Sequence, residues 1–192
     1  MKKIILHIGS PKTGSTTIQN YLLINQDKLK INFIDYPLCS NEGRHDYLSK
    51  FIFYRNNFFE KKINELINYI DKSINNIFIL SDEDIFMILL QKKENFKYFI
   101  DKLKSKYVLN ILLFLRDKDS FTESLHKQLI VAGPFDFPLL NNYTKSLNFF
   151  KKEIALKDYY LNYDEIIHFF LKNDVFIEII PYNKNFDVIN LL

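Results

Sequence analysis

Residues 4–23, IILHIGSPKTGSTTIQNYLL, decide the fold that we expect for this chain. The stretch opens with an apolar run of the kind found in a buried parallel strand. Gly9 and Gly14 follow in a short loop, where glycine lets the backbone turn sharply. A helix is predicted from Ser15, because apolar residues then recur at helical spacing, at Ile18, Tyr21, Leu22 and Leu29. The free amides of its first turn point back at the loop and form a cradle for an anion.

The loop invites comparison with the nucleotide triphosphate loop G-x-x-x-x-G-K-[ST]. Gly9, Gly14 and Thr16 fall in place, but Ser15 stands where that loop needs a lysine. The only lysine in the loop is Lys12, three residues earlier. We therefore expect an anion other than a triphosphate.

The segment Pro11-Lys12-Thr13-Gly14-Ser15-Thr16-Thr17, directly after His7-Ile8-Gly9, resembles the 5'-phosphosulfate loop of sulfotransferases that use 3'-phosphoadenylyl sulfate (PAPS). The members that the chain most resembles are bacterial. The resemblance implies that Lys12 is the catalytic electrophile and that the other residues from Pro11 to Thr17 bind the 5'-phosphate. A lysine ammonium and backbone amides suit sulfuryl transfer, because negative charge develops on the bridging and equatorial oxygens.

A second segment, which begins at Arg116 and reaches Ser124 eight residues later, resembles the family's 3'-phosphate element. Arg116 follows a strongly apolar predicted strand, and Ser124 falls inside the next predicted helix. An arginine at the mouth of the sheet can hold a phosphate bidentately while the serine hydroxyl donates from the helix. The resemblance thus implies binding of PAPS and of its product, 3'-phosphoadenosine 5'-phosphate (PAP).

Sulfuryl transfer also needs a general base, for which His45 and Glu42 are the candidates. His45 is preferred, because the resembled bacterial members have a histidine in similar context and imidazole titrates near neutrality. Two alternatives remain: His45 only caps the following helix, or Glu42 is the base. Ser81 and Glu83, after a further predicted strand, resemble a family element that orders the site by hydrogen bonds; an ATPase would instead hold magnesium with an acidic residue there. No metal is expected.

The composition of the whole chain limits the possible functions. A single domain over residues 1–192 is expected, with no linker, and the net charge of +3 is too dispersed to indicate nucleic acid binding. The single cysteine, Cys39, cannot form an internal disulfide, which favours a cytoplasmic protein. No segment is apolar for long enough to span a membrane. The sequence leaves the oligomeric state open.

The remaining sequence alternates predicted strands and helices, which indicates an α/β fold. We expect a three-layer α/β/α domain with a mainly parallel central sheet, like that of P-loop NTPases. Further strands are predicted at 32–36, 76–80, 108–115 and 175–180. Further helices are predicted at 59–74, 85–90, 96–104, 119–131 and 160–172.

These features together predict a sulfotransferase that moves a sulfuryl group from PAPS to a hydroxyl of a glycan or other small acceptor. One alternative is a P-loop nucleotide or small-molecule kinase, and another is a non-catalytic nucleotide-binding remnant. Family members usually continue beyond the position of Asn183 with a loop that closes over the nucleotide. The resemblance therefore implies a C-terminally shortened chain with slow or absent turnover, unless residues 132–143 supply the lid.

Overall fold

The computed structural model describes residues 1–132, 146–155 and 162–182 of the 192-residue chain. The strands in these ranges are β1 (Lys3–His7), β2 (Ile34–Asp35), β3 (Ile77–Ser81), β4 (Val108–Arg116) and β5 (Phe176–Tyr182). The helices there are α1 (Ser15–Ile24), α2 (Gln26–Ile31), α3 (Tyr47–Tyr54), α4 (Asn57–Lys72), α5 (Asp84–Ile88), α6 (Lys93–Lys104), α7 (Lys118–Ala132), α8 (Leu147–Ala155) and α9 (Tyr163–Lys172).

The described strands form one sheet in the order β2-β3-β1-β4-β5, with every pair parallel. The central strand, β1, pairs with β3 on one side and with β4 on the other, so that His7 lies opposite both Ser81 and Leu112. Because all strands point the same way, the loops that follow β1, β3 and β4 meet at one edge of the sheet. This edge is where open α/β sheets bind ligands.

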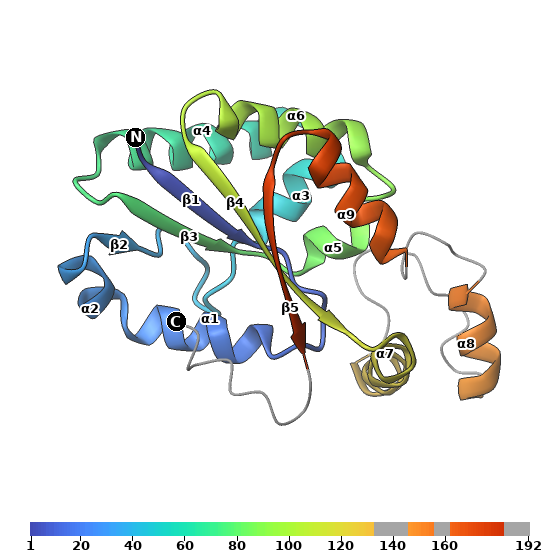
Figure 1. Ribbon diagram of the computed structural model, residues 1–192. Helices are drawn as coiled ribbons and strands as arrows, with labels where there is room; N and C mark the ends of the chain where they lie inside the picture. Colours follow the sequence, from blue (N-terminus) through green and yellow to red (C-terminus); the bar gives the residue numbers. More distant parts are fainter. Residues whose placement is uncertain (133–145, 156–161, 183–192) are drawn as a thin grey trace.

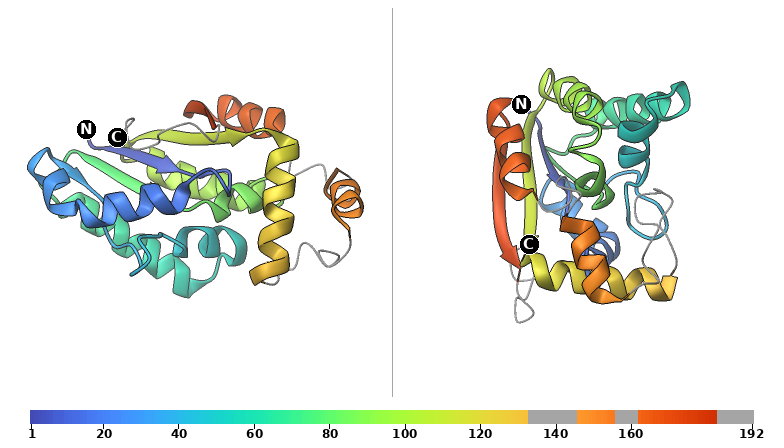
Figure 2. Two further views of the ribbon diagram at one scale, coloured as in Figure 1. Left: turned by 90° about the horizontal axis from the view of Figure 1, so that it is seen from below. Right: turned by 90° about the vertical axis from the view of Figure 1, so that its right-hand side faces the viewer.

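Helices cover both faces of the sheet, an arrangement compatible with three α/β/α layers (Figure 1). The larger core lies between one face and helices that include α3, α4, α6 and α9. The smaller core lies on the other face, where Ile18 and Leu22 of α1 pack with Tyr36, Ile79 and Phe114. The views in Figure 2 show the two layers from below and from the side. The α/β class expected from the sequence is confirmed, and the described sheet is entirely parallel.

The predicted elements differ from the observed ones in three places. The helix predicted from Ser15 through Leu29 is two helices, because the backbone of Asn25 (φ −100°, ψ 15°) leaves the helical conformation and its side-chain Nδ2 donates to the Tyr21 carbonyl at 2.9 Å. Leu29 therefore belongs to α2, although it still packs in the smaller core. Helices α3 and α8 have no predicted counterpart. Of these, α3 is short, at 8 residues, and its side chains are mostly aromatic or apolar, so its helical periodicity is hard to read.

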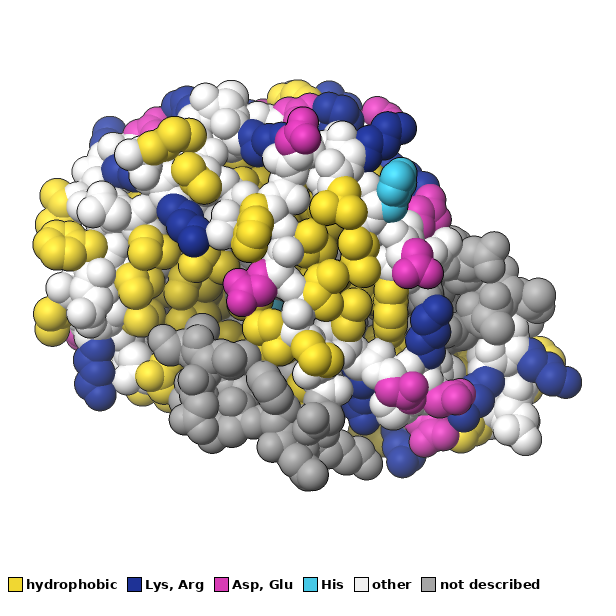
Figure 3. Space-filling model, in the orientation of Figure 1, with side chains coloured by type: hydrophobic (Ala, Val, Ile, Leu, Met, Phe, Trp, Pro, Cys, Tyr) yellow, Lys and Arg dark blue, Asp and Glu magenta, His cyan; other side chains and the backbone are white. Residues whose placement is uncertain are grey.

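The sheet ends at β5, which has no further partner among the described strands. Phe176 and Ile179 of this strand are exposed apolar residues. Figure 3, in the orientation of Figure 1, shows apolar side chains gathered on the side of the molecule where β5 lies in front. The edge of the sheet that carries the loop after β1 lies at the opposite end of β1 from the N-terminus (Figure 1).

Candidate functional site

The loop after β1 is tied to β4 by backbone hydrogen bonds. Ser10 N donates to the Phe114 carbonyl at 2.6 Å, and Phe114 N donates to the Gly9 carbonyl at 2.9 Å. The parallel ladder between β1 and β4 thus continues into the loop. The start of the loop is thus held in place by the central part of the sheet.

Three residues of this loop adopt left-handed backbone conformations: Gly9 (φ 83°), Lys12 (φ 67°) and Gly14 (φ 81°). Such a conformation is easy for glycine, but in a non-glycine residue it costs of order 1 kcal/mol or more. The loop is held in this shape partly by the Thr13 hydroxyl, which donates to the Ser10 carbonyl at 2.5 Å. Backbone strain of this kind is common at ligand-binding sites, so the conformation of Lys12 marks this loop as a candidate site.

The loop and the first turn of α1 present hydrogen-bond donors that have no acceptor among the described residues. The Gly14 carbonyl accepts from Thr17 N and Ile18 N, but the backbone amides of Ser15 and Thr16 donate to no described residue. The hydroxyls of Ser10 and Ser15 are buried and also lack a partner in the described part of the chain. Buried polar atoms without a partner are rare and call for an explanation. An anion in the loop would supply the missing acceptors, so these residues fit the 5'-phosphate end of PAPS.

Arg116, at the end of β4, reaches back to the same loop. Its Nη1 donates to the Lys12 carbonyl at 2.9 Å, and its Nε donates to the Ser120 hydroxyl at 3.0 Å. The guanidinium also lies 5.7 Å from the centre of the Tyr182 ring. The structure therefore brings the two predicted nucleotide elements, Lys12 and Arg116, together.

The other predicted donor-binding residues lie around this centre. Thr16 and Thr17 are exposed on the first turn of α1, whereas Pro11 and Thr13 are buried. Ser124 is half-buried in α7, one turn beyond Ser120 and on the same side of that helix. Ser120, rather than Ser124, holds Arg116 in this structure.

A buried polar network joins the ends of β1 and β3 below the loop. His7 Nδ1 lies 2.7 Å from the Ser81 hydroxyl, and Gln19 Nε2 donates to Ser81 Oγ at 3.0 Å and to Glu83 Oε2 at 2.6 Å. Burial lowers the pKa of His7 to about 4, although Glu83 opposes this shift, so the ring is neutral at pH 7. The other ring nitrogen, Nε2, is buried and has no hydrogen-bond partner among the described residues.

Glu83 packs against the loop through its Cβ atom. A Cβ built on Gly9 would come within 2.8 Å of Glu83 Cβ, so only glycine allows this approach. The carboxylate oxygen Oε2 accepts from Gln19, whereas Oε1 lies 3.9 Å from Nε of Arg44, and the Glu83 side chain is 14% exposed. Oε1 thus has no close hydrogen bond within the described part of the chain.

Arg44 joins Glu83 to two neighbouring carboxylates. Its Nη2 lies 2.5 Å from Asp84 Oδ2 and 3.8 Å from Asp82 Oδ1. Burial alone would lower the pKa of Arg44, but the three carboxylates raise it above its ordinary value. Asp82 is fully buried and accepts from the backbone N–H of Ser49 at 2.8 Å. Its carboxylate therefore organises the protein interior and offers no exposed oxygen to a magnesium ion.

His45 does not lie where a general base must be. It is fully buried, its Nε2 donates to the Pro37 carbonyl at 2.6 Å, and its Nδ1 accepts from Ser81 N at 3.1 Å. Burial lowers its pKa to about 4. Since both ring nitrogens are used, neither is free to take a proton from an acceptor. The structure gives His45 the role of fastening the segment after β2 to the end of β3.

Glu42, the other predicted base, is exposed and lines a surface hollow of about 360 Å³ together with Ser40 and Arg44. The Glu42 side chain makes no hydrogen bond or ion pair with the described residues of the loop or with Glu83. The sequence did not predict three further residues of the site, which are Ser10, Gln19 and Arg44. For Ser10 its position between Gly9 and Pro11 was the available clue.

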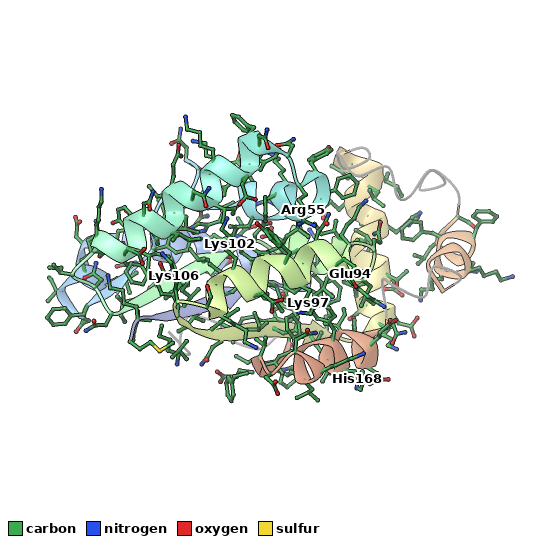
Figure 4. All side chains as sticks on the ribbon, turned by 90° about the horizontal axis from the view of Figure 1, so that it is seen from above. Arg55, Glu94, Lys97, Lys102, Lys106 and His168 are labelled. Carbon is green, nitrogen blue, oxygen red and sulfur yellow. The ribbon has the colours of Figure 1, made fainter. Side chains whose placement is uncertain are left out.

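Several lysines on the face opposite the loop are paired with carboxylates. Figure 4, which looks down on α4, α6 and α9, labels three lysines on and after α6. Each is paired with a carboxylate: Lys97 with Asp101, Lys102 with Glu60, and Lys106 with Asp71. His168 is exposed on α9 (Figure 4).

The described residues contain no group of three His, Cys, Asp or Glu side chains that could hold a metal ion. Among the helices of the described ranges, none has both the length and the apolar character needed to cross a bilayer. The predicted alternative lid, 132–143, and the segment after Asn183 lie outside the described residues, apart from position 132. No protein-family model matches the chain, and no curated protein matches its sequence.

Proposed function

We propose that this chain is a PAPS-dependent sulfotransferase with a P-loop NTPase-like fold, acting on a hydroxyl-bearing acceptor. The observation that carries the proposal is the loop after β1, with its free amides and the two buried, unpartnered hydroxyls of Ser10 and Ser15. A strand-loop-helix with these donors suits a bound phosphate. The motif resemblance of Pro11–Thr17 to the 5'-phosphosulfate loop selects PAPS among the possible phosphates.

Two groups of residues would bind the two phosphate ends of PAPS. The amides from Lys12 to Thr16 and the nearby hydroxyls would hold the 5'-phosphate, and the Lys12 ammonium would balance the charge that develops on the bridging oxygen. Arg116, with Ser120 and Ser124 beside it on α7, would hold the 3'-phosphate. PAPS supplies the sulfuryl group: the bond from sulfur to the phosphate oxygen breaks as a bond from sulfur to the acceptor oxygen forms, and PAP leaves.

Glu83 replaces His45 as the preferred general base. Its Cβ packs against Gly9 and its carboxylate is held by Gln19, so one oxygen is fixed while the other faces Arg44 at 3.9 Å. A base in this position takes the hydroxyl proton of the acceptor as the new bond to sulfur forms. Glu42, which is exposed on the rim of the neighbouring hollow, is the second candidate.

Calorimetry with PAP and with ATP, each with and without magnesium, tests the proposal. Tight PAP binding that does not need magnesium is the expected result. Magnesium-dependent binding of ATP in preference to PAP would instead establish the kinase alternative, which Gly9, Gly14 and Thr16 motivate. Binding of PAP without sulfuryl transfer to any hydroxyl would identify a nucleotide-binding remnant. The cytoplasmic location and the glycan acceptor remain predictions from the sequence.

A further inference from the structure

A cavity of about 470 Å³ lies beside the candidate site, where the segment 38–40 meets the first turns of α3 and α4. Its apolar wall is formed by Leu38, Cys39, Tyr47, Phe58 and Phe59. The volume falls within the range of about 300–1,000 Å³ that is usual for small-molecule sites. The rings of Phe58 and Phe59 pack edge to face with centres 5.1 Å apart, so the aromatic wall has a defined shape.

The charged residues of the cavity wall neutralise one another. Lys50 Nζ lies 2.5 Å from Asp46 Oδ2, and Lys62 Nζ lies 3.2 Å from Glu65 Oε2. Two acids and two bases therefore leave the wall without net charge. A charged ligand would have to break one of these pairs, whereas a neutral ligand with an apolar body would not.

The cavity adjoins a second hollow, with which it shares two lining residues. Ser40 and Asp46 line both the cavity and the hollow of about 360 Å³ that contains Glu42 and Arg44. Arg44 in turn lies 3.9 Å from Glu83, which packs against Gly9 of the phosphate loop. A molecule with its body in the cavity can therefore extend a polar end along the hollow towards Glu83.

We propose that this cavity binds the body of the acceptor, which makes the acceptor a neutral alcohol with an alkyl or aryl body rather than a free sugar. The inference rests on the proposed sulfotransferase function. A free sugar carries a hydroxyl on almost every carbon, and these groups would lose their hydrogen bonds to water against Leu38, Phe58 and Phe59. An apolar body gains from the same contacts, and its single hydroxyl is the group that reaches the site.

The test uses 4-phenyl-1-butanol as the probe and glucose as the polar comparison. Phe58 is 63% exposed, so Phe58→Ser removes a cavity wall with little effect on the core. Phe176 on β5 is similarly exposed, at 60%, and lies outside the cavity lining, so Phe176→Ser is the matched control. Binding of each alcohol is followed by NMR line broadening, with and without PAP, and sulfuryl transfer is measured in parallel.

Wild type should bind 4-phenyl-1-butanol and not glucose. Phe58→Ser should weaken this binding by about tenfold, which is the scale expected for losing part of a buried aromatic contact, and Phe176→Ser should leave it unchanged. In transfer assays, Phe58→Ser should raise the KM for the alcohol and leave the KM for PAPS unchanged. Equal binding of the alcohol by wild type and Phe58→Ser, or preferential transfer to glucose, overturns the inference.

The outcomes separate this inference from the function on which it rests. Tight PAP binding without any binding of the alcohol would overturn the acceptor site and leave the donor site standing. Phe58-dependent binding of the alcohol by a protein that binds no PAP would refute the sulfotransferase function. That result would also overturn the acceptor role, and the cavity would then be a site for apolar alcohols alone.

Discussion

Arg116 Nη1 donates to the carbonyl oxygen of Lys12 at 2.9 Å, so the guanidinium that is expected to hold the 3'-phosphate also supports the loop expected to hold the 5'-phosphate. The same side chain uses Nε on Ser120. Binding of the 3'-phosphate by Arg116 is therefore expected to affect the backbone of the loop at the 5'-phosphate. The left-handed conformation of Lys12, with φ 67°, is maintained in part by this bond.

Arg116→Ala should weaken PAP more than adenosine 5'-phosphate, because only PAP carries the 3'-phosphate. Loss of a charge-assisted hydrogen bond of this kind costs about 1.5–3 kcal/mol. Adenosine 5'-phosphate should also weaken slightly, since the Lys12 carbonyl loses its partner. Calorimetry with both ligands measures the difference, and Ser120→Ala should give a smaller effect in the same direction. Equal losses for both ligands would show that Arg116 only supports the loop.

Lys12→Ala should abolish sulfuryl transfer and leave the fold intact. Lys12 is half-buried in the loop, and its ammonium group forms no ion pair with a described residue. Removing one donor from a preorganised site typically raises the activation barrier by about 3–4 kcal/mol. Transfer rates with PAPS and the urea midpoint measure the two effects. Lys28→Ala on the outer side of α2 is the control, because Lys28 is exposed. Near-normal transfer by Lys12→Ala would remove this lysine from the mechanism.

Glu83→Gln should slow transfer by about a hundredfold to ten-thousandfold with little change in PAP affinity, because it keeps the shape of the side chain and removes the proton acceptor. Glu42→Gln is the matched variant from the exposed rim and should have little effect. The reverse order of the two variants would make Glu42 the base.

The contribution of His7 and His45 to stability should fall as the pH is lowered from about 6.5 towards 4, whereas Asp82 and Asp84, whose pKa values are raised by burial, oppose this change. His7 and His45 have pKa values of about 4 when folded against an ordinary 6.5, so the unfolded chain binds protons that the folded chain refuses. The preference for neutral rings contributes fully to the free energy of unfolding above pH 6.5. At pH 5 this contribution should be smaller by about 2 kcal/mol for each histidine.

Urea unfolding at pH 7 and pH 5 measures this dependence. His45→Asn should be less stable at pH 7, because the Pro37 and Ser81 backbone groups lose a partner, but its stability should change less with pH. His168→Asn is the control, because His168 is exposed on α9 and should leave the slope as it is. A His45→Asn protein with the wild-type slope would contradict the assignment of the titration to this ring.

The succession of strands and helices along the chain and the position of the loop after β1 could be predicted from local patterns, because each depends on a short segment. The apolar run before Gly9 and the one before Arg116 each predict a buried strand, and these are β1 and β4. The resemblance names Ser81 and Glu83, but the contact of Glu83 with Gly9 could not be predicted from a local pattern. Glu83 meets Gly9 only because β3 pairs with β1, and that pairing depends on side chains far apart in the sequence.

His45 shows the opposite failure. A histidine in a polar loop after a strand suggests an accessible base, and nothing in the surrounding residues reveals that its ring is enclosed. The burial arises because the ring packs against Tyr36, with centres 4.8 Å apart, and reaches the backbone of Ser81 at the end of β3. A motif match gives the type of residue, while burial decides whether that residue can exchange a proton.

The attachment of the phosphate loop to β4 also constrains how the chain must fold. Lys12 and Arg116 are 104 residues apart, so the loop cannot reach its final shape until β4 has been synthesised and has paired with β1. Contacts between such distant residues slow folding, because a long chain segment must first be closed. β3 precedes β4 in the chain and can pair with one side of β1 first, but the other side of β1 stays open until β4 has emerged. That open strand edge is therefore prone to aggregation during synthesis.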